Sequence, residues 1–136
     1  MNAMRFDLPT PDVETQPFWD AAKEGRLLIK QCRVCGKHHF YPRPFCPTCW
    51  SDDVDWVEAS GLATLYTWSI VRVNDLPPFP ERVPYVAAVV ELAEGPRMMT
   101  NVVDCEFDRL EMGMALDAVF HPASDDVTIV QFRPAG

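Results

Sequence analysis

The segment CRVCGKHHFYPRPFCPTC, residues 32–49, decides the fold of this chain. It contains two Cys-x-x-Cys turns, Cys32 with Cys35 and Cys46 with Cys49, separated by ten residues. Four thiolates are the tetrahedral ligand set that Zn²⁺ accepts in structural sites. Because protein ligands then fill the whole coordination shell, the spacing predicts one structural zinc ion with no open position for a substrate.

The sequence leaves two other interpretations of these cysteines open. A lone Cys-x-x-Cys pair can be a thioredoxin-type redox dithiol, but here two pairs occur and no βαβ pattern surrounds them. Iron in a rubredoxin-like site would use the same four ligands, and the sequence does not separate iron from zinc. We therefore expect a metal-binding cysteine cluster, with zinc as the expected ion.

The composition of the 136-residue chain fits one ordinary domain, or a small metal module attached to a compact domain. No apolar run approaches the ~20 residues of a membrane span. The N-terminus lacks the basic and then apolar pattern of a signal peptide, and thiolates kept available for metal fit a reducing compartment. The sequence predicts a cytoplasmic protein without membrane contact.

The formal net charge of −8 is unevenly distributed. The segment from Arg26 to Cys49 carries five basic residues and no acidic one, so every Asp and Glu lies elsewhere. This cationic segment has two interpretations: it solubilises a small module, or it binds phosphate or an acidic partner surface.

A short helix is expected between Thr15, which can cap its start, and Gly25, which can end it. Its apolar face consists of Phe18, Trp19 and Ala22. So short a helix is not stable alone. It must pack against the rest of this domain or against a partner.

After the second cysteine pair the chain becomes rich in β-branched and aromatic residues, which predicts strands. Five are expected: Leu62–Val71, Tyr85–Leu92, Arg97–Val103, Ala115–His121 and Val127–Phe132. The turn Ala93–Pro96 predicts that the second and third strands form a hairpin. The proline-rich linker Val73–Pro84 is expected to be an extended loop rather than a helix. Five strands without long helices between them indicate an OB-fold barrel.

The predicted fold is therefore mainly β and has three parts. Residues 1–29 form an N-terminal arm and helix, of which residues 1–10 are the arm. Residues 30–56 form the zinc ribbon, with His39–Tyr41 as its return strand. Residues 57–136 form the five-stranded OB-fold barrel.

The order of these motifs resembles the zinc-ribbon/OB-fold family, long filed as a domain of unknown function, whose members accompany thiolase-like enzymes. The resemblance runs from about Phe18 to the C-terminus. The stretches that carry it, besides the cysteine pairs, are Phe18-Trp19, Gly25-x-Leu27, Pro42-Arg43-Pro44, Gly61-x-x-x-Leu65-Tyr66-Thr67-Trp68, Pro84-Tyr85, Glu94-Gly95-Pro96-Arg97, Met112-Gly113 and Phe132-Arg133-Pro134-Ala135.

This resemblance implies a rubredoxin-like ribbon, an OB barrel and a non-catalytic role beside an acyl-CoA enzyme of the thiolase superfamily. Similar proteins serve thiolase-fold aldolases that shorten sterol side chains, and others bridge a thiolase and a synthase. We therefore expect a hetero-oligomer with a thiolase-like subunit. Acyl-CoA is expected at the shared interface.

Candidate contacts with such a partner come from the ribbon and the helix. Coenzyme A carries several negative charges at one end, which suits cationic side chains. The candidates for its phosphates are Arg33, Lys37 and Arg43. The candidates for partner docking are the aromatic residues Phe18, Trp19, Phe40 and Tyr41.

No residue is predicted to be catalytic. Cys105, the one thiol outside the ribbon, lies between Asp104 and Glu106, whose charges disfavour a thiolate. His121 and the pair His38-His39 have structural interpretations, and no Gly-rich phosphate loop, Ser–His arrangement or HExxH helix is present. An enzyme acting alone is the less favoured hypothesis.

The contrasting class is nucleic-acid binding, because zinc ribbons and OB barrels both occur there. OB recognition usually needs a positive groove with stacking aromatic residues on its central strands. The predicted strands Tyr85–Leu92 and Arg97–Val103 offer one basic and one aromatic residue, and the sequence pI is near 4.7. Nucleic-acid binding is therefore the alternative hypothesis and not the leading one.

Overall fold

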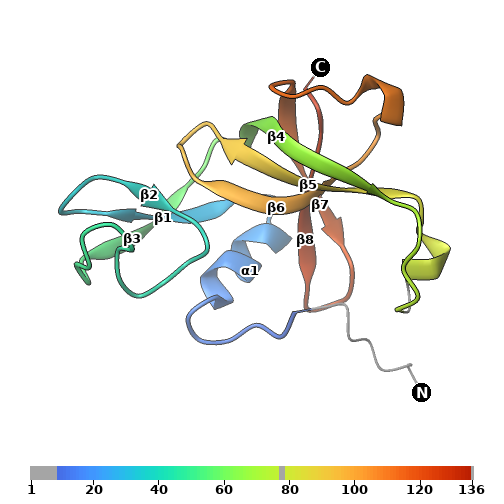
Figure 1. Cartoon of the computed structure of the whole chain (residues 1–136). Coiled ribbons are helices and arrows are strands. Elements are labelled where there is room, and N and C mark those ends of the chain that lie inside the picture. Colours follow the sequence, from blue (N-terminus) through green and yellow to red (C-terminus); the bar gives the residue numbers. More distant parts are fainter. Residues whose placement is uncertain (1–8, 77–78, 136) are drawn as a thin grey trace.

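The computed structural model describes residues 9–76 and 79–135. Within them lie one α-helix, a three-stranded sheet and a closed five-stranded barrel. The sheet projects from one side of the barrel, and the helix α1 lies below their junction (Figure 1). The predicted fold class, mainly β with a short helix, a cysteine ribbon and an OB-type barrel, is confirmed. Most of the predicted N-terminal arm, residues 1–8, lies outside the described residues.

The helix α1 spans Gln16–Lys23, as the sequence predicted, but its start is built differently. Thr15 occupies the N-cap position without a side-chain capping bond. Its hydroxyl instead donates to Asp12 Oδ1 at 3.0 Å, because Asp12 folds a tight turn before the helix. At the other end Gly25 has φ +77°, a left-handed conformation that glycine adopts without steric cost.

The ribbon sheet has the order β2-β1-β3, with β1 at Leu28–Cys32 in the centre. The return strand β2 covers only His38–His39. The prediction that it runs through Tyr41 was wrong, because Phe40 and Tyr41 leave the sheet and turn towards the barrel. The strand β3, Val54–Glu58, was not predicted from the sequence, and it pairs with β1 along its whole length.

The barrel strands match the predicted ones to within two residues at every end. They are β4 (Leu62–Val71), β5 (Tyr85–Leu92), β6 (Arg97–Val102), β7 (Ala115–Pro122) and β8 (Thr128–Pro134), joined in the order β4-β5-β6-β8-β7. The predicted β5–β6 hairpin is present. The linker before β5 contains a short 3-10 turn, η1 (Phe79–Glu81), and a second one, η2 (Phe107–Arg109), precedes β7. Residues 77 and 78 of that linker lie outside the described residues.

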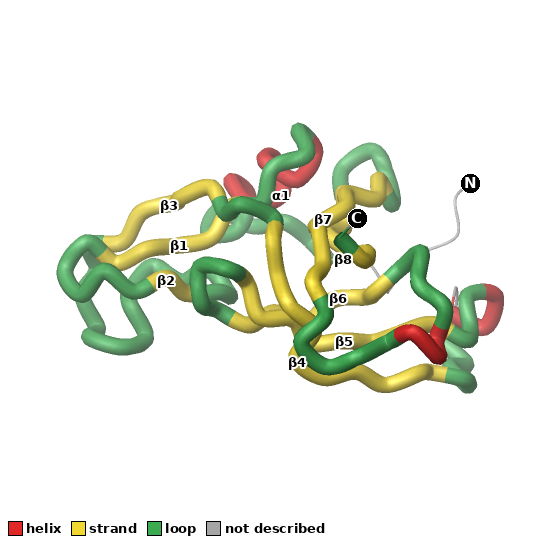
Figure 2. The backbone as a smooth tube through the Cα atoms, turned by 90° about the horizontal axis from the view of Figure 1, so that it is seen from above, coloured by secondary structure: helices red, strands yellow, loops and turns green. Residues whose placement is uncertain are grey.

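The barrel closes weakly between β6 and β8. The two strands pair in parallel at one position, Val102 with Phe132. Beyond it, the Thr100 hydroxyl donates to the carbonyl of Val130 at 2.9 Å. Viewed from above, α1 lies on the side of the barrel formed by β7 and β8 (Figure 2). The helix and the loop that follows β2, which we call the ribbon loop, pack against the weakly paired β6–β8 side of the barrel.

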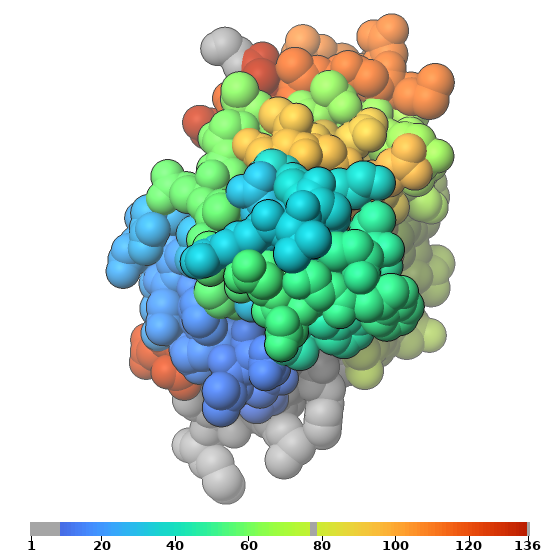
Figure 3. All heavy atoms as spheres, turned by 90° about the vertical axis from the view of Figure 1, so that its left-hand side faces the viewer, coloured from blue at the N-terminus to red at the C-terminus, as the bar shows by residue number. Residues whose placement is uncertain are grey.

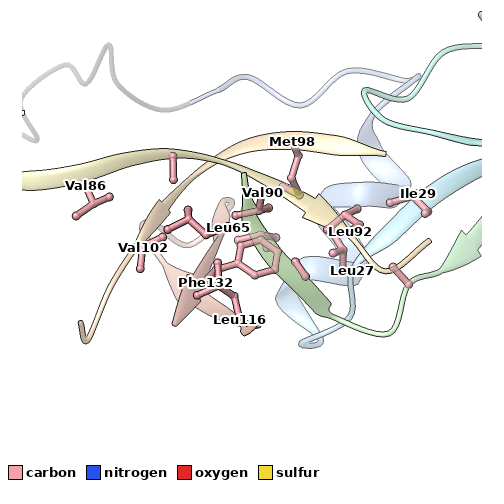
Figure 4. Packing of buried hydrophobic residues seen from close by; sticks show 14 of the residues in the cluster. Leu27, Ile29, Leu65, Val86, Val90, Leu92, Met98, Val102, Leu116 and Phe132 are labelled. Carbon is pink, nitrogen blue, oxygen red and sulfur yellow. The ribbon is translucent and has the colours of Figure 1, made fainter. Parts of the chain in front are cut away.

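One hydrophobic core joins the barrel to the base of the ribbon. Phe132 is completely buried and lies beside Leu65 and Leu116 inside the barrel (Figure 4). Leu27 and Ile29, from the segment that contains β1, reach into the same cluster. Burial of a large aliphatic side chain contributes about 1.5–3 kcal/mol, so this shared core fixes the position of the ribbon on the barrel.

Candidate functional site

The four ribbon cysteines converge at the outer end of the ribbon sheet. Their sulfur atoms all lie within 4.8 Å of one another. The Cys32–Cys49 sulfurs are 3.5 Å apart and the Cys35–Cys46 sulfurs 3.6 Å apart. A tetrahedral site with metal–sulfur bonds of about 2.3 Å has sulfur–sulfur edges of about 3.8 Å. The four cysteines are therefore positioned to bind one metal ion, as predicted.

Two similar turns hold these sulfurs in place. In the first turn the backbone N–H of Val34 donates to Cys32 Sγ at 3.3 Å. In the second, the N–H of Thr48 donates to Cys46 Sγ at 3.4 Å. Cys32 and Cys46 are buried, whereas the other two cysteines are exposed. Backbone donors aimed at a sulfur favour its anionic form, which is the form that binds metal.

The thiol groups are electrostatically unequal. The backbone N–H of Cys49 is the main cause that lowers the pKa of Cys46 to about 6. The backbone N–H of Cys35 likewise lowers the pKa of Cys32. A backbone hydrogen bond from Ser51 lowers the pKa of Cys49. Burial of the sulfur and the neighbouring thiols raise this pKa by more, and together these causes bring it to about 11. A metal ion must therefore displace at least the proton on Cys49.

A second candidate site is an apolar groove of about 270 Å³ at the junction of α1, the ribbon loop and the open side of the barrel. We call it the aromatic groove. Its lining is Thr15, Phe18 and Trp19 from the helix, Phe40, Tyr41 and Pro42 from the loop, Met98 and Met99 from β6, and Ile129 and Val130 from β8. All four predicted docking residues are therefore brought together in one place.

The rings in this groove support one another. Phe18 meets Trp19 edge to face, with ring centroids 4.8 Å apart and an interplanar angle of 86°. Phe18 also lies 5.6 Å from Phe40, which lies 4.5 Å from Tyr41. Such arrangements stabilise aromatic pairs beyond their buried area. The sequence analysis missed the contribution of β6 and β8, because their closeness to the ribbon loop depends on the incomplete closure of the barrel.

The three candidate phosphate ligands have different surroundings. The Arg33 guanidinium forms ion pairs with Asp55 and, at 3.6 Å, with Asp53. Lys37 and Arg43 are exposed and form no ion pair within residues 9–76 and 79–135. The structure thus leaves two of the three cations available to an external anion.

The remaining cations of the predicted basic segment are also engaged. Arg26 forms ion pairs with Glu24 and Glu58. Lys30 is buried, with its ammonium 4.6 Å from the centroid of the Trp56 ring. Among the acidic partners, Glu24 precedes the segment, and Asp53, Asp55 and Glu58 lie in or directly before β3, which pairs with β1. Fewer cations of this segment are therefore available to an external anion than the sequence alone suggests.

The residues weighed for catalysis lie in ordinary surroundings. The half-buried Cys105 thiol donates to the backbone carbonyl of Glu106 at 3.4 Å. His39 is buried, and neither of its ring nitrogens has a hydrogen-bond partner in the described part of the chain. His121 is exposed near the end of β7 and pairs with Ile129 of β8. None of the described helices is long and apolar enough to cross a membrane.

Comparison with known proteins assigns both parts of the chain. Residues 19–55 match the family described as "ChsH2, rubredoxin-like zinc ribbon domain". Residues 56–121 match "ChsH2, C-terminal OB-fold domain". The first match names zinc as the metal of such ribbons, and the cysteine geometry described above fits it.

Curated relatives carry two kinds of name. A "probable enoyl-CoA hydratase alpha subunit" of Thermomonospora curvata is 40% identical over 119 residues, which is 87% of this chain but 37% of that protein. This chain therefore spans little more than a third of that relative. A "DUF35 domain-containing scaffold protein" of Methanocaldococcus jannaschii is 36% identical over 110 residues, covering 79% of this chain and 77% of the relative.

Among solved structures, a chain of "Ltp2-ChsH2(DUF35) aldolase" superposes with a TM-score of 0.84 and 36% sequence identity. The match covers 95% of this chain and all of the other. The agreement in sequence, ribbon and barrel extends over nearly the whole length. This chain therefore belongs to the DUF35 family of proteins, which combine a ChsH2-type zinc ribbon with an OB-fold domain.

Proposed function

We propose that this chain is a non-catalytic accessory subunit that binds a thiolase-superfamily enzyme and helps to form or gate its acyl-CoA site. The observation that carries the proposal is the aromatic groove, where three separate parts of the fold present apolar side chains on one surface. Apolar surface of this kind is typical of interaction sites when polar residues surround it. The names of two relatives, a probable enoyl-CoA hydratase alpha subunit and an aldolase, support an enzyme of acyl-CoA metabolism as the partner.

The exposed side of the groove offers specific contacts to such a partner. Met99 is 68% exposed and Tyr41 is 51% exposed, although both belong to the groove. Arg43 follows Pro42 directly and is exposed at the ribbon end of the groove. A partner segment or the thin, partly apolar arm of an acyl-CoA can lie against the groove while Arg43 meets phosphate. Arg33 contributes less in this proposal, because two carboxylates already hold it.

The nucleic-acid alternative gains little support from the structure. The strands β5 and β6 carry one cation, Arg97, and its guanidinium stacks 3.8 Å from the centroid of the Tyr66 ring. Single-stranded nucleic acid needs several cations and free aromatic faces along its path. We therefore retain the accessory role as the proposed function.

Gel filtration of the chain with a thiolase-superfamily enzyme of the same organism tests this proposal. The two proteins are expected to elute together as one complex. Met99→Glu should weaken the complex, because it places a carboxylate in the apolar groove. Met112→Glu is a matched control, since Met112 is 73% exposed and lies outside the groove. The proposal would be contradicted if Met99→Glu and Met112→Glu weakened the complex equally, or if the unmodified chain formed no complex.

The role of the cations is tested separately in the assembled complex. Arg43→Glu should raise the Michaelis constant for the acyl-CoA substrate without dissociating the two subunits, because the substitution places a carboxylate near the CoA phosphates. An unchanged Michaelis constant would remove Arg43 from the proposed site.

A further inference from the structure

The two cysteine turns of the ribbon have the same backbone geometry but different residues at one position. Gly36 follows the first pair and has φ +77°, and Trp50 follows the second pair and has φ +66°. The N–H of Gly36 donates to the carbonyl of Cys32 at 3.0 Å, and the N–H of Trp50 donates to the carbonyl of Cys46 at 2.8 Å. Trp50 therefore stands where the first turn has glycine.

Tryptophan is an unfavourable residue for this position. In the left-handed region the Cβ atom crowds the backbone, which is unfavourable for ordinary residues and carries no steric cost for glycine. Asp104, the other non-glycine residue with positive φ in the described chain, belongs to a type that tolerates this region. A bulky residue in such a conformation points to a role for its side chain that outweighs the cost.

The side chain of Trp50 is not occupied by packing in the core. It is 74% exposed. Its ring stacks on that of Phe45, with centroids 5.4 Å apart and an interplanar angle of 14°. Phe45 is half-buried, so the stack holds the indole in a fixed orientation while its outer face meets solvent. A rigid, exposed tryptophan loses little conformational entropy on binding, and tryptophan is enriched among interface hot spots.

The surroundings of Trp50 indicate what it binds. Val34, at the tip of the first cysteine turn, is 67% exposed and adds apolar surface. Lys37 belongs to the same turn, because its carbonyl accepts a hydrogen bond from the N–H of Cys32, and it forms no ion pair within the described residues. The two cysteine turns meet where the sulfurs of Cys32 and Cys49 lie 3.5 Å apart, so the first turn and Trp50 share one end of the ribbon. We call Val34, Lys37, Phe45 and Trp50 the ribbon-tip surface. Seen from the ribbon side, the ribbon stands in front of the barrel and α1 and so can be reached by a large partner (Figure 3).

We propose that Trp50 anchors a second contact with the acyl-CoA enzyme, whose matching surface is an apolar pocket edged by carboxylates. This inference rests on the proposed function and extends it from the aromatic groove to the ribbon-tip surface. The indole fills the pocket, and Lys37 faces the carboxylates. Charges at the rim of an interface mainly accelerate association, whereas a buried aromatic anchor mainly slows dissociation.

The glycine in the first turn supplies the variant that tests this proposal. Trp50→Gly should keep the fold and the metal, because glycine suits φ +66° better than tryptophan does. Trp50→Asn is the second variant, since asparagine also tolerates this region. The probe is the thiolase-superfamily enzyme of the same organism, with affinity measured by calorimetry and zinc measured per chain. Met112→Ser is the control for loss of an exposed apolar side chain.

We expect both Trp50 variants to retain one zinc per chain and to bind the enzyme at least roughly tenfold more weakly, mainly through faster dissociation. Lys37→Glu should slow association and reduce its dependence on salt. Unchanged affinity in Trp50→Gly overturns the ribbon-tip contact and leaves the proposed function intact, whereas no binding by the unmodified chain removes the proposed function itself. Loss of zinc from both variants, or salt-sensitive binding of single-stranded DNA that depends on Trp50, also overturns the proposal.

Discussion

The hydroxyl oxygen of Tyr41 accepts a hydrogen bond of 3.2 Å from the backbone N–H of Met99, which lies 58 residues later in the chain. This N–H belongs to β6 on the side where the barrel closes incompletely. A ribbon residue therefore takes the place of a missing strand partner. The bond connects the metal-bearing ribbon to the open side of the barrel and forms part of the aromatic groove.

Tyr41→Phe should lower the free energy of unfolding by about 1 kcal/mol, because the ring stays and only the hydrogen bond is lost. The effect is expected to be modest, since Tyr41 is half exposed and water can reach the freed N–H. Urea denaturation followed by tryptophan fluorescence measures it. Tyr66→Phe is a suitable control, because Tyr66 is similarly exposed and offers its ring to Arg97. An equal loss in both variants would contradict a specific role of the Tyr41 hydroxyl.

Cys46→Ser should abolish tight zinc binding and unfold the ribbon, because one of four ligands is lost and the metal contributes to folding. Cys105→Ser should retain one zinc per chain, since Cys105 lies outside the four-cysteine cluster. Elemental analysis of the purified variants gives the metal content directly. A zinc content near zero in the unmodified chain, or the same content in both variants, would contradict the assignment of the site.

Zinc binding should weaken on acidification. The metal binds thiolates, and the pKa of Cys46, lowered to about 6, sets the range in which that thiolate becomes protonated. Between about pH 7 and pH 5 we expect the affinity to fall by at least roughly a hundredfold, because the metal displaces the Cys49 proton throughout this range and Cys46 also becomes protonated within it. Competition with a coloured chelator at the two pH values measures the change. Constant affinity across this range would show that thiolate protonation does not limit binding.

His39 should make the fold sensitive to mild acid. Burial lowers the pKa of His39, so below the ordinary histidine pKa near 6.5 the unfolded chain takes up a proton that the folded chain resists. Stability is therefore expected to fall as the pH drops from about 6.5 towards the lower pKa of the folded state. Lys30, which faces His39 across the β1–β2 pair, also disfavours the imidazolium charge.

His39→Leu removes this titration and should flatten the dependence of stability on pH, because leucine needs no hydrogen bonds at a buried site. Urea denaturation of both chains at about pH 7.5 and pH 5.5 makes the comparison, with zinc kept in excess. His121→Leu, at an exposed site, serves as the control. If His39→Leu keeps the full pH dependence of the unmodified chain, another group is responsible.

The barrel could be predicted from the sequence because its strands are encoded locally. These strands are rich in β-branched and aromatic residues, and turns such as Ala93–Pro96 and Met112-Gly113 separate several of them, so β4 to β8 were predicted with ends within two residues of the observed ones. The strand β3 was missed because Asp53 and Asp55 make its start look like a loop. Asp53 and Asp55 form ion pairs with Arg33, the residue that follows β1, and that contact depends on the β1–β3 register rather than on composition.

The metal ligands could likewise be named from their spacing, whereas the surfaces around them could not be completed. Phe18, Trp19, Phe40 and Tyr41 were predicted to dock a partner, but Phe18 is buried in the core. The assembly of these rings into one groove with Met99 depends on how β6 and β8 separate. Trp50 was overlooked, although a signal was present: it follows a Cys-x-x-Cys turn at the position where Gly36 follows the other. Only the positive φ shows how unusual that residue is there.

The division of labour between this chain and its partner is tested most directly by one measurement. The turnover of an acyl-CoA thioester is followed for the isolated chain, for the thiolase-superfamily enzyme alone and for the two mixed. We predict no turnover by the isolated chain, and higher activity or lower Michaelis constant in the mixture than with the enzyme alone. Steady turnover by the isolated, zinc-loaded chain, or kinetics that the chain leaves unchanged, would contradict the accessory role.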